Sequence, residues 1–335
     1  MINALSDDLF VTTKTTLRAL FMPDLTGDSE YLSNFSSKDK PWDIHRAIAD
    51  TVQSLYKSAR CDKYSDRIQT CGKLLEFALR SDEAGDVAIK LQTAHFCRVR
   101  HCPVCQWRRS MKWQAKMFQA MPDIKETYLT HRWLFVTLTV RNCDLINLRD
   151  TIKHMNKSFQ RLSELKRFPG VGWIKSVEVT RNPETGQAHP HFHCLMLVPA
   201  SYFGKGYITQ EEWRSLWQQC LRSDYLPVVN VKAIKPRKES SDHDDIGQAI
   251  VETLKYSVKE SDLVADENWL VELTNQLHKT RAISIGGVLK DFLREESDDD
   301  DLIHIDEDKE ELQDEAIKIF FGWREAVKRY KKVDR

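Results

Sequence analysis

The sequence predicts an α+β fold built on an antiparallel sheet, with helices packed on the sheet, a small cysteine-rich segment and helical terminal regions. Two observations lead to this prediction. The periodic segments follow one another as strand, helix, hairpin, helix, strand and helix, an order typical of α+β proteins. Between two of the strand-like segments, residues 182–186 read Asn-Pro-Glu-Thr-Gly, which is turn chemistry and makes those two strands a hairpin.

Hydrophobic periodicity places each element in turn. Residues 133–141 alternate apolar and polar side chains, as a half-buried strand does. Residues 145–162 space their apolar side chains by threes and fours, which predicts one buried helix stripe. Thr209, followed three residues later by Glu212, is a helix-capping pattern. The expected strands are 133–141, 173–180, 191–198 and 226–234, and the expected helices are 44–56, 145–162, 209–221, 245–260 and 311–332.

Length and composition are those of a globular chain. The 335 residues, 41% apolar and 30% charged, suffice for two or three domains. The N-terminus lacks the pattern of a secretion signal, and no apolar run approaches the roughly 18 residues of a membrane span. We therefore expect a cytoplasmic protein with no membrane partner. The expected domains are 1–60, of unknown role, 61–125, rich in cysteines and cations, 126–265, the α+β core, and 266–335, a helical region with an acidic linker.

Charge is balanced in total but uneven along the chain. Fifty basic residues match fifty acidic ones, yet no acidic residue occurs from Val87 to Pro122, and residues 291–315 are strongly acidic. A phosphate-binding surface needs only a local positive field, because salt screens charges over about 10 Å. The alternative is that the basic run is a solvated helix face. The cations predicted to contact nucleic-acid phosphates are Arg98, Arg100, Arg108, Arg109 and Lys112.

Three histidines alternate along the expected strand that follows the turn. Residues two apart on a strand point to the same face, so His191 and His193 place two imidazoles side by side. His189 has the same parity, although the following proline and the turn lie beside it. Two imidazoles on one face are a natural platform for a divalent metal. A lone histidine is more often a satisfied core residue, but three at this spacing favour metal binding.

A third metal ligand is expected from the neighbouring strand. If the hairpin turns around Glu184 and Thr185, antiparallel pairing sets Glu178 opposite His191, on the same face. A carboxylate beside two imidazoles suits Mn²⁺ or Mg²⁺ better than a closed zinc site. The alternative is an exposed glutamate that pairs with a neighbouring cation.

Residues 252–259 predict a helix stripe that carries a carboxylate, a phenol and an ammonium. Glu252, Tyr256 and Lys259 are four and three residues apart and share one face. Such a set suits phosphoryl transfer: the phenol attacks phosphorus, the lysine offsets developing charge, and the glutamate takes a proton from a second nucleophile. Alone, this pattern is usually ordinary helix surface. The opposite stripe, expected to bury against the sheet, consists of Ile246, Ile250 and Leu254.

The cysteines suggest a structural zinc ion. Cysteines of a cytosolic chain rarely form disulfides. Cys102 and Cys105 form a C-x-x-C knuckle of the kind zinc favours, and Cys71 and Cys97 would complete four thiolates. Buried cysteines without metal are the alternative; a redox motif is disfavoured because its βαβ context is missing. The rival ligands are Cys61, His95 and His101.

Taken together, these motifs resemble the plasmid rolling-circle replication initiators of the Rep_1 type, within the wider class of HUH endonucleases. The resemblance covers roughly residues 70 to 260, and the segments 1–60 and 265–335 stay unmatched. The histidine pair alone is shared with relaxases and some transposases, whereas the combined set is specific. The stretches that carry the resemblance are Phe135–Val140, His189–His193, Glu252–Lys259, Cys97–Arg109 and Tyr202–Trp213.

The resemblance implies a metal-dependent endonuclease that nicks one strand of a plasmid origin, at a single-stranded or hairpin site flanked by duplex DNA. It implies His191 and His193 as ligands of the catalytic ion, Tyr256 as the nucleophile that forms a 5′-phosphotyrosine and frees a 3′-hydroxyl, and Glu252 as the base at termination. Glu178 is our own inference from strand pairing, not a matched family position. We expect a host helicase and a host polymerase as partners, and a homodimer stays open.

Three alternatives remain. A relaxase or an insertion-sequence transposase would use the same chemistry, but relaxases usually carry their histidines after the tyrosine, and here the tyrosine follows. A DNA-binding regulator would keep the zinc and the cations without nuclease activity. A zinc hydrolase unrelated to DNA would leave the basic, tryptophan-containing run at 107–113 unexplained.

Overall fold

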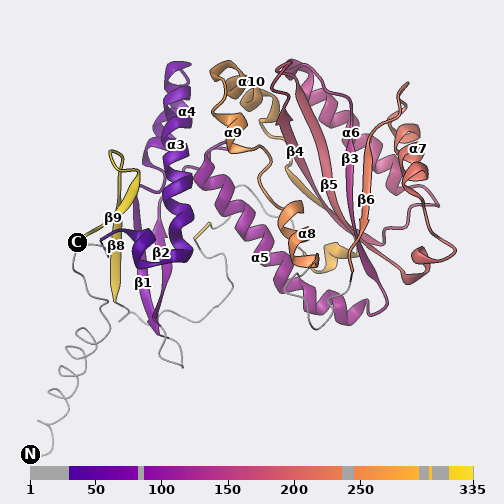
Figure 1. Cartoon of the computed structure of the whole chain (residues 1–335), viewed down its shortest axis with the longest axis horizontal. Helices are drawn as coiled ribbons and strands as arrows, with labels where there is room; N and C mark the ends of the chain where they lie inside the picture. Colours follow the sequence, from indigo (N-terminus) through magenta and orange to yellow (C-terminus); the bar gives the residue numbers. More distant parts are fainter. Residues whose placement is uncertain (1–29, 82–86, 236–244, 294–301, 304–316, 335) are drawn as a thin grey trace, which may run out of the picture. The chain divides into compact units, whose positions relative to one another are not determined.

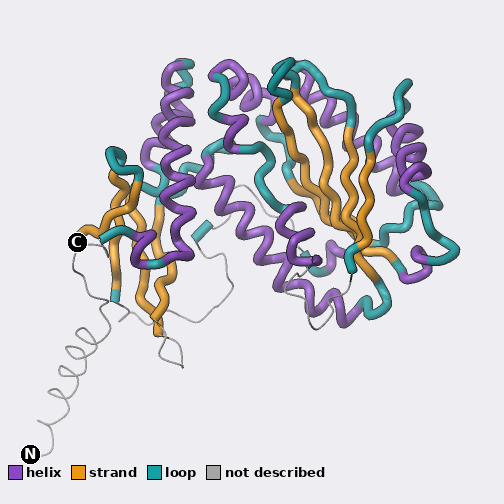
Figure 2. Tube along the Cα trace, viewed as in Figure 1, coloured by secondary structure: helices purple, strands orange, loops and turns teal. Residues whose placement is uncertain are grey.

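The structure, a computed structural model, describes residues 30–81, 87–235, 245–293, 302–303 and 317–334. Its chain divides into two compact units (Figures 1 and 2). The small unit comprises Met1–Ala47, Gln69–Phe96 and Glu307–Arg335. The core unit comprises Ile48–Ile68 and Cys97–Asp306.

The core unit contains a five-stranded antiparallel sheet with the strand order β6-β3-β5-β4-β7. The hairpin between its two longest strands turns at Asn182, whose Oδ1 accepts hydrogen bonds from the N–H groups of Glu184 and Thr185. The antiparallel sheet and the four expected strands are thus confirmed. The strands are β3 (Arg132–Thr139), β4 (Gly172–Arg181), β5 (Ala188–Val198), β6 (Val229–Ala233) and β7 (Ile283–Gly287).

Helices cover both faces of this sheet (Figure 1). On one face, Phe159 of α6 meets Phe192 of β5 and Trp173 of β4 edge to face. On the other face, α5 and α8 bury Met117 and Ile250 against apolar residues of β4 and β5. Neighbouring residues of a strand point to opposite faces, so β5 buries Phe192 under α6 and turns His191 and His193 to the α8 side. The three helices are α5 (Pro103–Thr127), α6 (Leu148–Ser163) and α8 (Asp245–Thr253).

Two of the expected helices form as their patterns predict. The apolar stripe of α6 is buried from Leu148 to Leu162. At the start of α7, the Thr209 side chain accepts a hydrogen bond from the Glu212 N–H, and the Glu212 carboxylate accepts one from the Thr209 N–H. The expected helix 44–56 lies within α3. The remaining helices are α2 (Leu32–Phe35), α3 (Lys40–Ser58), α4 (Asp62–Thr70), α7 (Gln210–Leu221), α9 (Glu260–Leu263) and α10 (Glu267–Leu277), with 3-10 turns at 37–39, 145–147, 200–203 and 288–291.

The small unit is built on a second antiparallel sheet, with the order β2-β1-β8-β9. This sheet corrects the prediction for the C-terminus: the described part of the expected helix 311–332 is a β-hairpin. The first strand of this hairpin, β8, buries every second residue, namely Ile319, Phe321 and Trp323, which is a strand pattern. β8 pairs with β1, a strand that lies more than two hundred residues earlier in the chain. Most of the acidic segment, at 294–301 and 304–316, lies outside the described residues. The strands are β1 (Leu74–Ser81), β2 (Val87–Ala94), β8 (Lys318–Arg324) and β9 (Arg329–Val333).

The two units do not follow the boundaries expected at residues 60, 125 and 265. Of the cysteine-rich segment 61–125, residues 69–96 belong to the small unit, whereas residues 61–68 and 97–125 belong to the core unit. The C-terminal hairpin joins strands from the first third of the chain. The reason is long-range strand pairing, which local composition does not report.

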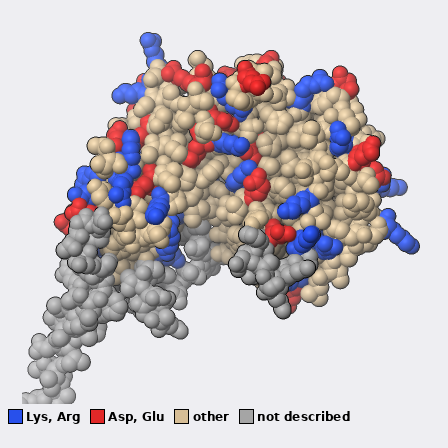
Figure 3. Space-filling model, in the orientation of Figure 1, with Lys and Arg blue, Asp and Glu red and all other residues tan. Residues whose placement is uncertain are grey.

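No helix in the described part of the chain is long and apolar enough to pass through a membrane. On the face that Figure 3 shows, Lys and Arg side chains stand among Asp and Glu side chains. This mixture agrees with the equal totals of basic and acidic residues.

Candidate active site

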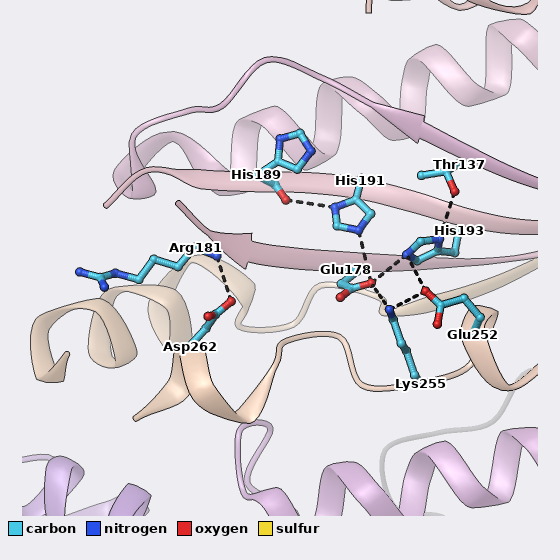
Figure 4. A network of polar contacts seen from close by, with 9 residues as sticks. All are labelled: Thr137, Glu178, Arg181, His189, His191, His193, Glu252, Lys255 and Asp262. Atoms are coloured by element: carbon cyan, nitrogen blue, oxygen red, sulfur yellow. Dashed lines mark hydrogen bonds and ion pairs between the residues drawn. The ribbon is translucent and has the colours of Figure 1, made fainter. Parts of the chain in front are cut away.

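Three neighbouring strands bring polar side chains to the α8 face of the core sheet (Figure 4). In the register of β4 and β5, Glu178 pairs with His191, as the turn position predicts. In the register of β3 and β5, Thr139 pairs with His191 and Thr137 pairs with His193. The predicted strand pairing is therefore confirmed.

Glu178, His191 and His193 form a compact set of metal-ligand atoms. One atom from each lies within 4.8 Å of the others. Glu178 Oε2 is 2.8 Å from His193 Nε2 and 3.3 Å from His191 Nε2, and the Glu178 residue is 3% exposed. One carboxylate and two imidazoles that converge on a buried point fit a hard divalent ion such as Mn²⁺ or Mg²⁺.

Neighbouring groups hold the two imidazoles in this orientation. The His193 ring stacks on Phe135, with centroids 5.4 Å apart, and its Nδ1 lies 3.3 Å from the Thr137 hydroxyl. His191 Nδ1 lies 3.2 Å from the carbonyl oxygen of His189. Contacts at Nδ1 leave Nε2 of both rings directed at Glu178, and such outer contacts normally fix the rings that bind a metal.

The charges in the site favour an ionised Glu178. Burial alone would raise the pKa of this carboxyl, but hydrogen bonds from His191 and His193 and the charge of Lys255 lower it well below its usual range. The pKa of Lys255 is raised in turn by Glu252 and Glu178, against the effect of burial. A carboxylate that stays charged is ready to bind a cation.

His189, the third predicted imidazole, is not brought into this set. Its Nδ1 lies 2.8 Å from Oδ1 of Asn142, in the loop that follows β3. Burial, and then the charge of His191, lower the pKa of the His189 ring. Its backbone carbonyl contributes to the site instead, through the contact with His191.

The predicted helix 245–260 ends early, which corrects the arrangement expected for Tyr256 and Lys259. α8 stops at Thr253, so these two residues do not share a helix stripe with Glu252. The chain leaves the helix because it joins the sheet edge: Ser257 accepts a hydrogen bond from the Val179 N–H (2.8 Å), and Val258 bridges Val179. The expected apolar stripe is confirmed, since Ile250 and Leu254 are fully buried and Ile246 packs on the same cluster.

Tyr256 lies in the non-helical stretch that follows α8, between two anchored backbone segments. On one side, Ser110 of α5 donates a hydrogen bond to the Leu254 carbonyl (2.6 Å). On the other side, Ser257 is bonded to Val179, the strand residue next to Glu178. Burial raises the pKa of the Tyr256 phenol to about 12, and the charge of Glu260 adds to the rise. The hydroxyl thus remains protonated at neutral pH.

Lys255 is the site residue that the sequence patterns missed. Its Nζ lies 2.6 Å from Glu252 Oε1 and 3.1 Å from Glu178 Oε2 (Figure 4). Lys259, the predicted cation, instead precedes α9 as its N-terminal capping residue. The sequence did contain a signal for this contact: Lys255 follows Glu252 by three residues, a spacing that also places two side chains on one helix face.

Three of the predicted zinc ligands gather in the core unit. The sulfur atoms of Cys97, Cys102 and Cys105 lie within 4.8 Å of one another. Cys97 Sγ and Cys105 Sγ are 3.7 Å apart, close to the separation of about 3.8 Å that tetrahedral zinc imposes on two thiolates. Cys71 is likewise buried and free of a disulfide, so the four cysteines are compatible with a structural zinc ion.

The rival ligands make other contacts. His101 is fully buried, with Nδ1 3.0 Å from the Thr274 hydroxyl, and the Cys61 thiol lies near the Ala59 carbonyl. His95 is exposed. Within the described ranges, none of the three joins the group of possible metal ligands.

The predicted DNA-binding cations largely bind the protein itself. Arg108 donates to the carbonyls of Leu302 and Ile303, at 2.9 Å each. Arg100 donates to a carbonyl at residue 280, and Arg109 to the carbonyl of Arg98. Arg108 and Lys112 are buried, so the alternative of a solvated helix face is wrong for them. The DNA contact of these cations stays a prediction.

Fold and site together define an α+β protein with a candidate divalent-metal centre on an antiparallel sheet, next to a segment that carries a tyrosine. The family model described as "Replication protein" (Rep_1) matches residues 88–331. The chain therefore belongs to this family of plasmid replication initiators.

Curated relatives agree with this assignment. A "Protein rep" from Streptococcus pneumoniae is 32% identical over 89% of this chain and 93% of the relative. A "Protein rep" from Bacillus amyloliquefaciens is 33% identical over 80% of this chain and 84% of the relative, and one from Lactiplantibacillus plantarum is 34% identical over 84% and 92%. No solved structure matches this chain.

Proposed function

We propose that this protein starts rolling-circle replication of a plasmid as an HUH-type endonuclease that nicks one strand of the origin with a single tyrosine. The observation that carries the proposal is the convergence of Glu178, His191 and His193 beside the edge of β4, where the segment that carries Tyr256 is anchored at Val179. Membership of the replication protein family supports origin DNA as the substrate.

The residues that would hold the catalytic ion are Glu178, His191 and His193. Their donor set, one ionised carboxylate and two imidazoles, fits Mn²⁺ or Mg²⁺. When bound, the ion would polarise the scissile phosphate and offset charge that develops on it. His189 would act through its carbonyl, which orients His191.

Tyr256 is the proposed nucleophile. Its hydroxyl oxygen forms a bond to phosphorus while the bond from phosphorus to the 3′ oxygen breaks. The phenol gives up its proton and the departing 3′ oxygen takes one up, so a 5′-phosphotyrosine and a free 3′-hydroxyl result. Burial raises the pKa of the Tyr256 phenol to about 12, so the phenol is protonated at neutral pH and loses its proton as it attacks phosphorus. A host polymerase would extend the 3′-hydroxyl while a host helicase separates the strands.

Glu252 is the proposed base for the release step. It lies at the end of α8, its carboxylate about half exposed, with Oε1 3.9 Å from His193 Nε2. From there it can take a proton from a water molecule or a strand-end hydroxyl that attacks the phosphotyrosine. The cation predicted to assist, Lys259, lies beyond the helix end, and Lys255 is the lysine that contacts Glu252.

A zinc ion held by Cys71, Cys97, Cys102 and Cys105 would be structural. Four buried thiols without an open position are the donor set of a closed site, which contributes folding energy and no catalysis. Such an ion would brace the N-terminal end of α5, which begins at Pro103 within this cysteine segment.

The test is incubation with supercoiled plasmid carrying the cognate origin, with Mn²⁺, with Mg²⁺ or with chelator, followed by a denaturing gel. We expect a metal-dependent, strand-specific nick with protein attached to the 5′ end. Tyr256→Phe should abolish the adduct, and the control Tyr207→Phe, at an exposed tyrosine before α7, should not. Adduct formation by Tyr256→Phe would refute the nucleophile. Binding without cleavage under every metal would favour the DNA-binding regulator.

A further inference from the structure

Two carboxylates of the site share one ammonium group. Lys255 Nζ contacts Glu252 Oε1 at 2.6 Å and Glu178 Oε2 at 3.1 Å, and the lysine side chain is 30% exposed. The oxygen of Glu178 that it contacts also faces His191 and His193. Lys255 therefore competes for the same carboxylate oxygen that would bind a divalent ion.

Glu252 lies close enough to the proposed metal site to become a further ligand of the ion. Glu252 Oε1 lies 3.9 Å from His193 Nε2, near enough for a small side-chain movement to bring it to an ion held by His193. A free carboxylate at that distance is an attractive ligand for Mn²⁺ or Mg²⁺. Glu252 would then be bound to the ion and no longer able to accept a proton.

We propose that Lys255 is a positioning residue that keeps Glu252 off the metal ion and so preserves it as a base, at the cost of weaker ion binding. The proposal rests on the proposed function, since it assigns a role within the same site. Two features of the structure support it. The ammonium repels a cation bound to Glu178 Oε2, and its shorter contact is with Glu252, which it holds at the end of α8.

A merely structural lysine and this positioning lysine lead to opposite results for ion affinity. Loss of a structural residue would disorder the ligands and weaken binding. Loss of Lys255 as proposed removes a repelling charge and frees Glu252 as a fourth ligand. Lys255→Met should therefore bind Mn²⁺ about tenfold more tightly than wild type, a change of about 1.4 kcal/mol. Lys255→Arg, which keeps the charge, should bind as wild type does.

The experiment measures Mn²⁺ affinity of the full chain by electron paramagnetic resonance, without DNA. The double variant Lys255→Met/Glu252→Ala should lose part of the gain, because the added ligand is gone. Lys153→Met, on the exposed side of α6, removes the same charge away from the site and should change nothing. Thermal melting checks folding, and Lys255→Gln replaces the methionine variant if that variant does not fold.

Unchanged or weaker Mn²⁺ binding in folded Lys255→Met would overturn the inference. If Tyr256-dependent nicking persists in wild type at the same time, the inference fails and the proposed function stands. Two outcomes would overturn the metal centre and the inference together: a wild type that binds no Mn²⁺, or a Glu178→Gln variant that binds Mn²⁺ as tightly as wild type. In a time course with labelled origin DNA, resolved on a denaturing gel, Lys255→Met should nick the DNA but accumulate several-fold more phosphotyrosine adduct than wild type.

Discussion

Glu178 Oε2 lies closer to His193 Nε2, at 2.8 Å, than to Nε2 of His191, although Glu178 and His193 are not register partners. In the antiparallel pairing, Glu178 stands opposite His191 and His193 stands opposite Ser176. The contact is thus diagonal, between residues offset by two positions on one sheet face. This diagonal lets a single carboxylate serve both imidazoles.

Glu178→Gln should weaken Mn²⁺ binding by about 100-fold or more, because even the loss of a group that only orients a metal ligand typically weakens metal binding by roughly 10- to 100-fold. The amide has nearly the shape of the carboxylate but lacks its charge, so folding should change little in comparison. Titration calorimetry with Mn²⁺ measures the affinity. Glu184→Gln, in the exposed turn between β4 and β5, is the matched control. Equal affinity in both variants would exclude Glu178 as a ligand.

Glu252→Ala should separate nicking from release. Attack by Tyr256 does not need Glu252, so adduct should form at a rate within a few-fold of wild type. Release should slow by a factor of about 100 or more, the usual contribution of a general base. A denaturing gel of a time course with labelled origin DNA follows both steps. Loss of nicking together with release would assign Glu252 to the first step.

Lys175 should make stability depend on pH in the alkaline range. Burial lowers the pKa of this ammonium to about 8, from 10.5, and its Nζ packs 3.7 Å over the Phe192 ring. The unfolded chain therefore keeps a proton between pH 8 and 10.5 that the folded chain releases, and stability rises with pH across this window. The contribution amounts to roughly 3 kcal/mol.

The measurement for Lys175 compares denaturant unfolding of wild type and Lys175→Met at pH 7.5 and 10.5. The difference in the free energy of unfolding, wild type minus variant, should increase by roughly 3 kcal/mol between the lower and the higher pH. A constant difference between the two proteins would show that Lys175 titrates normally in the folded state.

The cysteine cluster should hold one zinc ion per chain. Because ligand thiolates bind zinc only in the folded arrangement, removal of the ion should lower the melting temperature by roughly 10 °C or more. Cys105→Ser should lose zinc and stability, whereas Cys143→Ser, in the loop after β3, should lose neither. Zinc content by atomic absorption and melting by circular dichroism provide the two readouts. Full zinc content in Cys105→Ser would refute the site.

The sequence patterns correctly predicted those elements whose formation depends on residues close together in the chain. The alternation at 133–141, the helix stripe of α6 and the capping box at Thr209 all report neighbours within a few residues, and each formed as expected. The facing of Glu178 and His191 was predictable as well, since a short turn sets the register of a hairpin.

The misses share a physical cause. α8 ends at Thr253 because residues 257 and 258 bond to Val179 of β4, a partner distant in sequence. The C-terminal segment forms strands because β8 pairs with β1 from the first third of the chain. Helix propensity and spacing carry no information about such partners, so both segments were predicted as helix.

The sequence by itself determined the chemical inventory of this protein: two imidazoles on one strand and a carboxylate on the strand paired with it, a tyrosine and a glutamate nearby in the chain, and a zinc-type cysteine knuckle. Only the tertiary structure decided that Lys255 and not Lys259 contacts the carboxylates, and that Arg108 is buried and binds carbonyls. The sequence gives the residue types and their short-range spacing directly. The end of a helix and the direction of a long side chain depend on strand pairing and burial between segments that are distant in the sequence.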